Sequence, residues 1–260
     1  MAYRNLEIAD RGAVRTITVA RPDKLNALNR DTLVELTLAF TQAAQEESVR
    51  AIVLTGSGDK AFVAGADIAE MSDYTPIQAQ SFSRTGQKLM SLIERLGKPV
   101  VARIQGFALG GGMELAMACH LRVASEKARF GQPEINLGLI PGFGGTQRLL
   151  RLAGRGAALE LCLTGATIPA QRAYDLGIVT RLVAPEALDE AVTALADQLA
   201  AAAPLAAAGI LDAVLQGGES SLDQGLEFET QGFALIFSSE DMREGTRAFL
   251  DKRKPTFTGR

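Results

Sequence analysis

Two glutamates, Glu114 and Glu134, lie in segments that are otherwise apolar or rich in glycine. A carboxylate with such neighbours is either one partner of an ion pair or an acid that takes part in chemistry. For a single glutamate the ion pair is the simpler interpretation. Two of them beside a run of glycines favour acid–base chemistry.

The glycines at 110–112 follow a predicted strand and lead into a predicted helix. The first main-chain N–H groups of a helix have no partner inside it, so glycines there can present them to a carbonyl oxygen or an oxyanion. A second segment of small residues, 61–68, follows another predicted strand, at the sheet edge where α/β proteins bind ligands. Taken alone, this segment is better interpreted as an ordinary loop.

Two nucleotide-binding patterns are excluded. The pattern GxGxxG would need glycine where the chain has Leu115 or, for the run that starts at Gly142, where it has Gln147. A Walker-type phosphate loop fails as well, because Gly97 and Lys98 are followed by Pro99.

Two acids beside free N–H groups suit a reaction that passes through an enolate. Adding water to a double bond conjugated with a carbonyl needs a base for the water, an acid for the carbon and donors for the enolate oxygen. Burial and mutual repulsion can keep one carboxyl ionised while the other holds a proton. Catalysis by histidine or cysteine has few candidate residues in this chain. His120 is the only histidine and is expected to be structural, and Cys119 and Cys162 are expected to be buried thiols in a reducing compartment.

The elements that must position these candidate residues can be predicted from the sequence. The first half of the chain alternates strand and helix patterns. That alternation predicts parallel strands joined by right-handed crossovers. Beyond about residue 144 helical patterns prevail and strands almost disappear. Strands are expected at 5–9, 14–19, 51–55, 100–104 and 121–124, and helices at 31–47, 78–96, 113–119, 147–152, 157–163, 170–176, 188–203, 205–215, 222–237 and 240–252.

Composition sets the class of protein. The chain has 260 residues, 47% hydrophobic and 22% charged, as in globular proteins. Its net charge of −3, with both signs interspersed, offers no basic patch for nucleic acid. The N-terminus lacks the apolar stretch of a signal peptide, and the longest apolar run, 199–211, is too short to span a membrane, so we expect a cytoplasmic protein. We predict one α/β core over 1–200 and a helical region over 201–260 whose apolar faces suit oligomerisation.

Three segments resemble the enoyl-CoA hydratases of the crotonase superfamily: AFVAGADI at 61–68, GFALGGGMELAMAC at 106–119 and FGQPEINLGLIPGFGGTQRL at 130–149. The similarity covers the whole chain, including RPDKLNAL at 21–28 and REGTRAFLDKRKP at 243–255. It implies an α/β spiral of ββα units followed by helices that form a homotrimer, usually within a dimer of trimers. It also implies reversible addition of water to a trans-2-enoyl-CoA, giving a (3S)-3-hydroxyacyl-CoA, as in fatty-acid β-oxidation. No metal and no separate cofactor are implied, because CoA is part of the acyl-CoA substrate.

The resemblance also assigns roles to individual residues. Glu114 and Glu134 match the two acids, and the N–H groups of Ala66 and Gly111 match the oxyanion hole for the thioester carbonyl. Positions that match contacts to CoA are Lys24, Leu25, Ala27, Leu28, Ala64, Asp67 and Ile68, together with Phe233 and Lys252 of a neighbouring subunit.

The same superfamily contains isomerases, decarboxylases and dehalogenases that keep the oxyanion hole and vary the acids. The presence of both glutamates favours the hydratase, with an isomerase or a non-catalytic, RNA-binding relative as the alternatives. The chain departs from the usual pattern at Ala69, where lysine is common, at Met113, where cysteine is common, and at His120, where aspartate is common. The first departure would weaken a contact to a CoA phosphate, and the other two leave the proposed acids untouched.

Overall fold

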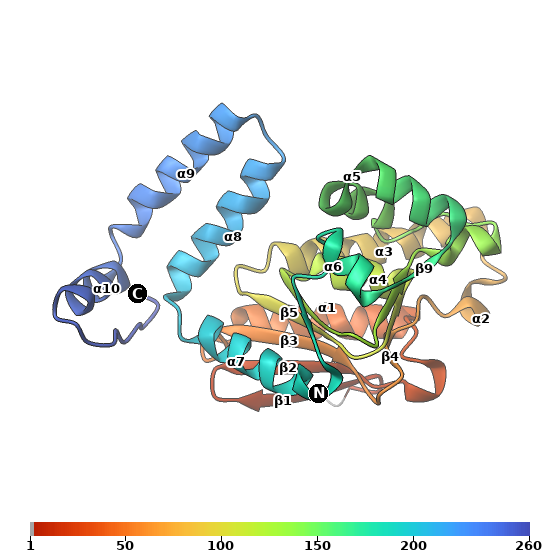
Figure 1. The fold of residues 1–260 in the computed structure, drawn as a ribbon, viewed down its shortest axis with the longest axis horizontal. Helices are drawn as coiled ribbons and strands as arrows, with labels where there is room; N and C mark the ends of the chain where they lie inside the picture. The colour runs from red at the N-terminus through yellow and green to blue at the C-terminus, as the bar shows by residue number, and fades with distance from the viewer. Residues whose placement is uncertain (1–2) are drawn as a thin grey trace.

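The chain forms two β-sheets surrounded by helices, in a computed structural model that describes residues 3–260 (Figure 1). The larger sheet has the order β1-β2-β3-β5-β7-β10 and the smaller one the order β4-β6-β8-β9. The strands are β1 (Leu6–Arg11), β2 (Val14–Val19), β3 (Ala51–Gly56), β4 (Ala61–Val63), β5 (Val100–Ile104), β6 (Phe107–Leu109), β7 (Leu121–Ser125), β8 (Arg129–Gly131), β9 (Thr167–Pro169) and β10 (Arg181–Val183).

Three successive turns of the chain each give one strand to each sheet. The pairs β3 and β4, β5 and β6, and β7 and β8 are followed by the helices α3 (Pro76–Glu94), α4 (Gly111–Ala118) and α5 (Gly145–Thr164). Within each sheet, the strands of successive turns are parallel. The expected spiral of ββα units is therefore confirmed.

The central strands of the larger sheet, β3, β5 and β7, are buried on both faces, to which successive side chains point alternately. In β3, Ile52 and Leu54 pack into the main core, which they share with α1 (Arg30–Gln45) and α3. Val53, between them, faces a second core formed with α7 (Leu188–Ala200). Coverage on both faces explains why this strand is apolar at nearly every position.

Beyond α7, three helices stand apart from the α/β core, as the blue segment of Figure 1 shows. They are α8 (Pro204–Gly218), α9 (Leu222–Ile236) and α10 (Glu240–Leu250). Neither α8 nor α9 has a buried residue, although both carry large apolar side chains. No single helix within residues 3–260 is long and apolar enough to cross a membrane, and only the bent pair Pro185–Ala200 and Pro204–Gly218 meets that test of length and composition.

Four expectations from the sequence need correction. The helices expected at 147–152 and 157–163 form one element, α5, interrupted by Gly154 with non-helical backbone angles. Strands are few beyond residue 144, but the two that occur, β9 and β10, had no predicted counterpart; they complete the two sheets, and the short helix α6 (Ala170–Asp175) lies between them. The short strands β4, β6 and β8 were not expected. Cys119 is buried as expected, but Cys162 is only partly buried.

Candidate active site

Both candidate acids and both candidate oxyanion donors line a single cavity of about 600 Å³. Glu114 comes from the first turn of α4, and Glu134 from the short helix η2 (Pro133–Leu137) that follows β8. Ala66 follows β4, and Gly111 begins α4. The smaller sheet thus delivers these residues to one place, because each of its parallel strands ends at the same edge.

The main-chain N–H groups of Ala66 and Gly111 are close together and free. Leu28 pairs with Ala66 as a parallel bridge, in which Leu28 N–H donates to Gly65 O at 2.9 Å and Asp67 N–H donates to Leu28 O at 2.8 Å. The N–H of Ala66 therefore points to the opposite side, and an ideal Cβ on Gly111 would lie 3.5 Å from that nitrogen. Within residues 3–260 neither N–H has a protein acceptor.

Two of the three glycines at 110–112, Gly110 and Gly112, are required by close contacts, and Gly110 also by its backbone conformation. Gly110 has φ +50°, which disfavours other residues, and a Cβ there would lie 2.8 Å from Glu134 Oε1. A Cβ on Gly112 would lie 1.8 Å from Val63 O, so only glycine lets α4 approach β4 this closely. The same contacts place the carboxyl of Glu134 against the start of α4.

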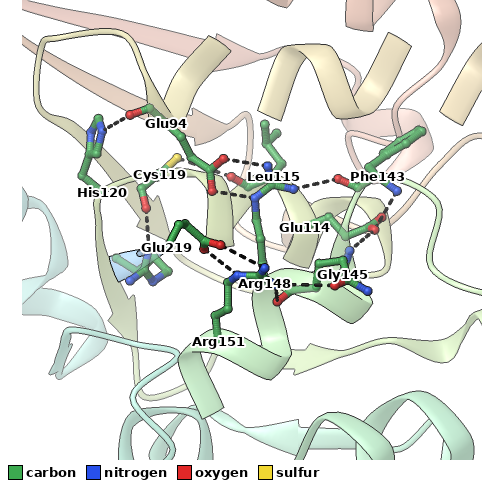
Figure 2. A network of polar contacts seen from close by, with 12 residues as sticks. Glu94, Glu114, Leu115, Cys119, His120, Phe143, Gly145, Arg148, Arg151 and Glu219 are labelled. Atoms are coloured by element: carbon green, nitrogen blue, oxygen red, sulfur yellow. Dashed lines mark hydrogen bonds and ion pairs between the residues drawn. The ribbon is translucent and has the colours of Figure 1, made fainter. Parts of the chain in front are cut away.

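Glu114 is held in place by main-chain donors. Its Oε1 accepts hydrogen bonds from Phe143 N–H at 2.7 Å and from Gly145 N–H at 2.6 Å, as Figure 2 shows. The residue is 1% exposed, and burial raises the pKa of its carboxyl from 4.5 to about 7. The value of about 7 is the net result, in which burial and the charge of Glu134 raise this pKa and the two N–H donors and Arg148 lower it. A carboxyl with this pKa can exchange a proton near neutral pH.

Glu134 is less constrained. It is partly buried, and burial raises the pKa of its carboxyl as well. The side chain of Gln132 is fully buried, and when its amide nitrogen is turned toward Glu134 it lies 3.1 Å from both carboxylate oxygens. The cavity therefore contains two carboxyl groups whose pKa values are both raised by burial.

An ion pair supports the loop that holds Glu114. Arg148 contacts Glu94 through two hydrogen bonds of 2.7 Å, and it donates a third to Phe143 O at 3.0 Å (Figure 2). His120 lies at the far end of this network: its Nδ1 accepts from Val100 N–H at 2.9 Å, and its Nε2–H donates to Glu94 O at 3.0 Å. Both ring nitrogens are engaged in main-chain contacts, and burial lowers the pKa of the ring, so this histidine holds structure together.

The candidate CoA-binding segments 24–28 and 64–68 lie side by side, and of the two only 64–68 lines the cavity. Ala64 N–H donates to Leu25 O at 3.0 Å, and Ala64 and Ile68 line the cavity. Asp67 is paired with Arg21 at 2.9 Å, and the exposed Lys24 precedes Leu25 in the same turn as Ala27 and Leu28. The structure does not bring the last two candidates, Phe233 and Lys252, into this cavity; they lie on α9 and directly after α10.

Several residues that shape the site carry no signal in the sequence. Phe143 and Gly145 act through main-chain N–H groups, which every residue except proline possesses. Arg148 is one of many arginines, and only the fold shows that it meets Glu94. Gln132 has a weak signal, because a glutamine two residues before a candidate acid can orient its carboxylate.

A family model described as enoyl-CoA hydratase/isomerase matches residues 9–260. The chain belongs to this family. It is 44% identical over 257 residues to a crotonyl-CoA hydratase of Syntrophomonas wolfei, with 99% of each chain covered. It is 43% identical to a short-chain-enoyl-CoA hydratase of Clostridium acetobutylicum, covering 98% of this chain and 97% of that protein.

Solved structures of the family share the fold throughout the chain. An enoyl-CoA hydratase from Bacillus anthracis matches with a TM-score of 0.95 at 38% identity, covering 99% of this chain and 100% of the other. A family member from Magnetospirillum magneticum, described as an enoyl-CoA hydratase/carnithine racemase, matches with a TM-score of 0.92 at 32% identity, covering 100% of this chain and 97% of the other. The fold is therefore shared by proteins described with more than one activity, and the site must decide between them.

Proposed function

We propose that the protein is an enoyl-CoA hydratase, which reversibly adds water to a trans-2-enoyl-CoA in syn fashion and gives a (3S)-3-hydroxyacyl-CoA. The observation that carries this proposal is the meeting of two carboxyl groups and two free N–H groups in one cavity. The hydratase names of the two relatives at 43% and 44% identity support it.

In the proposed reaction the thioester carbonyl accepts hydrogen bonds from Ala66 and Gly111 N–H. One glutamate, as carboxylate, takes a proton from water while the water oxygen bonds to the β-carbon. The π electrons move toward the carbonyl, and its oxygen gains the negative charge that the two N–H groups stabilise. The other glutamate, protonated, then gives its proton to the α-carbon. The raised pKa of both carboxyl groups suits this exchange, and CoA enters only as part of the substrate.

The main alternative is an enoyl-CoA isomerase of the same family. An isomerase moves one proton between two carbons of the substrate, which a single carboxyl can do. The cavity contains two, so the site favours hydration. A non-catalytic, RNA-binding role has no comparable support, because the chain has a net charge of −3.

We also propose that CoA lies along the segments 24–28 and 64–68, and that Phe233 and Lys252 reach it from a neighbouring subunit of a homotrimer or a dimer of trimers. The exposed apolar side chains of α8 and α9, which include Ile210, Val214 and Phe233, support burial against another subunit. Lys252 would then pair with a phosphate of CoA.

The deciding experiment follows the absorbance of the conjugated enoyl thioester with crotonyl-CoA and longer trans-2-enoyl-CoA substrates. We expect the band to disappear as water adds, with the (3S)-3-hydroxyacyl product identified by chiral analysis. Retention of conjugation with all substrates, together with conversion of a 3-enoyl-CoA into its 2-enoyl isomer, would instead establish the isomerase.

A further inference from the structure

The peptide group that joins Gly142 and Phe143 makes hydrogen bonds on both of its sides. Its N–H donates to Glu114 Oε1 at 2.7 Å. Its carbonyl, on Gly142, accepts from Ser83 Oγ at 2.6 Å and from Gln87 Nε2 at 3.1 Å. One rigid group thus connects Glu114 to two polar side chains of α3.

The two donors form a unit on the surface of α3. Ser83 and Gln87 are four residues apart and so lie on one face of the helix, where Gln87 Nε2 also donates to Ser83 Oγ at 3.3 Å. Gly86, between them, lies against the ring of Phe143, since an ideal Cβ there would fall 2.1 Å from Cδ1. Phe82 packs on the same ring, with 5.2 Å between centroids. Helix α3 therefore holds residues 142–143 by polar and apolar contacts together.

Because a peptide group is planar, fixing the direction of its carbonyl also fixes the direction of its N–H. Hydrogen bonds accepted by the carbonyl polarise the group and make its N–H a stronger donor. Both effects act on the same oxygen of Glu114, which also receives Gly145 N–H at 2.6 Å.

We propose that Ser83 and Gln87 are positioning residues for Glu114, acting through the Gly142–Phe143 peptide. This inference rests on the proposed function in one respect: it takes Glu114 as a proton-transfer group. Ser83 and Gln87 also line the cavity, so a direct contact with the acyl chain is the competing explanation.

The charged and titratable groups around Glu114 come from two other elements. Glu134 on η2 raises the pKa of Glu114, and Arg148 on α5 lowers it. Burial and the charges of Glu134 and Glu114 raise the pKa of Cys162 on α5. None of the three is changed by substitution at Ser83 or Gln87. A weaker Phe143 donor would stabilise the carboxylate less, so the pKa of Glu114 would rise.

The test compares Ser83→Ala, Gln87→Met and the double variant with Ser83→Thr, which keeps the hydroxyl. Gln80→Met measures what the loss of a cavity-lining amide does without loss of the Gly142 contact, because Gln80 is exposed, lines the same cavity and precedes Gln87 by seven residues on the same helix face. We expect kcat to fall about 3- to 10-fold in each single variant and further in the double variant, with KM for crotonyl-CoA changed less than about twofold. Ser83→Thr should retain most of the kcat.

A readout independent of activity is the ¹³C titration of the Glu114 carboxyl, assigned by its absence in Glu114→Gln. We expect its midpoint to rise by about 0.5 to 1 pH unit in the double variant and to stay in place in Gln80→Met. An unchanged midpoint in a folded double variant overturns the proposal, and an altered KM with an unchanged midpoint identifies a substrate contact instead. If the wild type hydrates no enoyl-CoA, the proposed function fails, while the titration still decides whether Ser83 and Gln87 act on Glu114.

Discussion

Glu114 and Glu134, twenty residues apart in the chain, line one cavity, and burial raises the pKa of both carboxyl groups. Their surroundings differ. Glu114 receives two main-chain N–H donors on one oxygen, whereas Glu134 lies on a short helix beside the buried amide of Gln132. Two carboxyl groups with different environments can hold different protonation states at one pH, which a reaction that both takes and gives a proton requires.

Replacing either acid by its amide should stop proton transfer and preserve shape. We expect Glu114→Gln and Glu134→Gln each to lower kcat for crotonyl-CoA hydration by about 10²- to 10⁴-fold, with little effect on the binding of CoA esters. Steady-state kinetics and calorimetric titration with a saturated acyl-CoA would measure the two effects. Glu160→Gln, at an exposed position on α5, is the control and should behave as wild type. Hydration at a near wild-type rate by either active-site variant would refute the assignment.

The raised pKa of Glu114 predicts how stability depends on pH. Its carboxyl has a pKa of about 7 in the folded state against 4.5 ordinarily, so the folded state binds the proton more tightly. The stability that this carboxyl contributes to the folded state is fully present below pH 4.5 and is lost as pH rises through 7. The free energy of unfolding falls by up to about 3 kcal/mol over this range. Urea unfolding at pH 5 and pH 8 would measure this. The free energy of unfolding of wild type, relative to that of Glu114→Gln, should be lower at pH 8 than at pH 5. The same difference at both pH values would contradict the prediction.

A pair of substitutions at Gly111 separates the N–H donor from the space around it. Gly111→Ala keeps the N–H and adds a Cβ 3.2 Å from Phe143 Cε2, a contact that a small shift of the ring can relieve. Gly111→Pro adds the same carbon and removes the N–H, at the first position of α4, where proline is tolerated. We expect the proline variant to have a kcat about 10²- to 10³-fold below that of the alanine variant. Equal rates in two variants with native circular dichroism would mean that this N–H does not stabilise the enolate.

The sequence predicted the larger sheet better than the smaller one, for a physical reason. Strands such as 51–55 and 100–104 are buried on both faces and appear as apolar runs. The strands β4, β6 and β8 have three residues each, too few for a pattern to show, and only pairing in the second sheet defines them. These short strands nevertheless lead directly into the segments that carry Ala66, Gly111 and Glu134.

The residues of the site likewise divide into those that the sequence could predict and those that it could not. Glu114, Glu134 and the glycines at 110–112 are visible because their residue types are unusual in their surroundings. The role of Ser83 and Gln87 is not, since polar residues four apart on a helix are typical of any solvent-facing surface. Their partner, Gly142, lies 59 and 55 residues further along the chain and contributes only a carbonyl oxygen.

Packing around Phe143 gives a further prediction. An alanine at Gly86 would place its Cβ within 2.1 Å of the Phe143 ring, which must then move and disturb the N–H that holds Glu114. We expect Gly86→Ala to destabilise the fold by about 1 to 3 kcal/mol and to lower kcat. Gly156→Ala, on α5 with no atom within 4 Å of the new carbon, is the matched control and should leave stability unchanged or increase it by up to about 1 kcal/mol. Equal stability and activity of the two variants in urea unfolding and kinetics would contradict this account.

Subunit complementation would test whether one chain completes the site of another. Lys252 is exposed and lies directly after α10, away from the cavity of its own chain, so a role in binding CoA requires a neighbouring subunit. Lys252→Glu should raise KM about tenfold by repelling a CoA phosphate, while Lys254→Glu, at a nearby exposed lysine, serves as the control.

Coexpression of Lys252→Glu with Glu114→Gln should form oligomers in which an intact Glu114 of one chain meets an intact Lys252 of the next. Such sites are wild type in every residue, so hydration at low substrate concentration should exceed the sum of the two parent enzymes. Activity equal to that sum, in mixtures shown by native mass spectrometry to contain both chains, would mean that each chain binds CoA without the Lys252 of its neighbour.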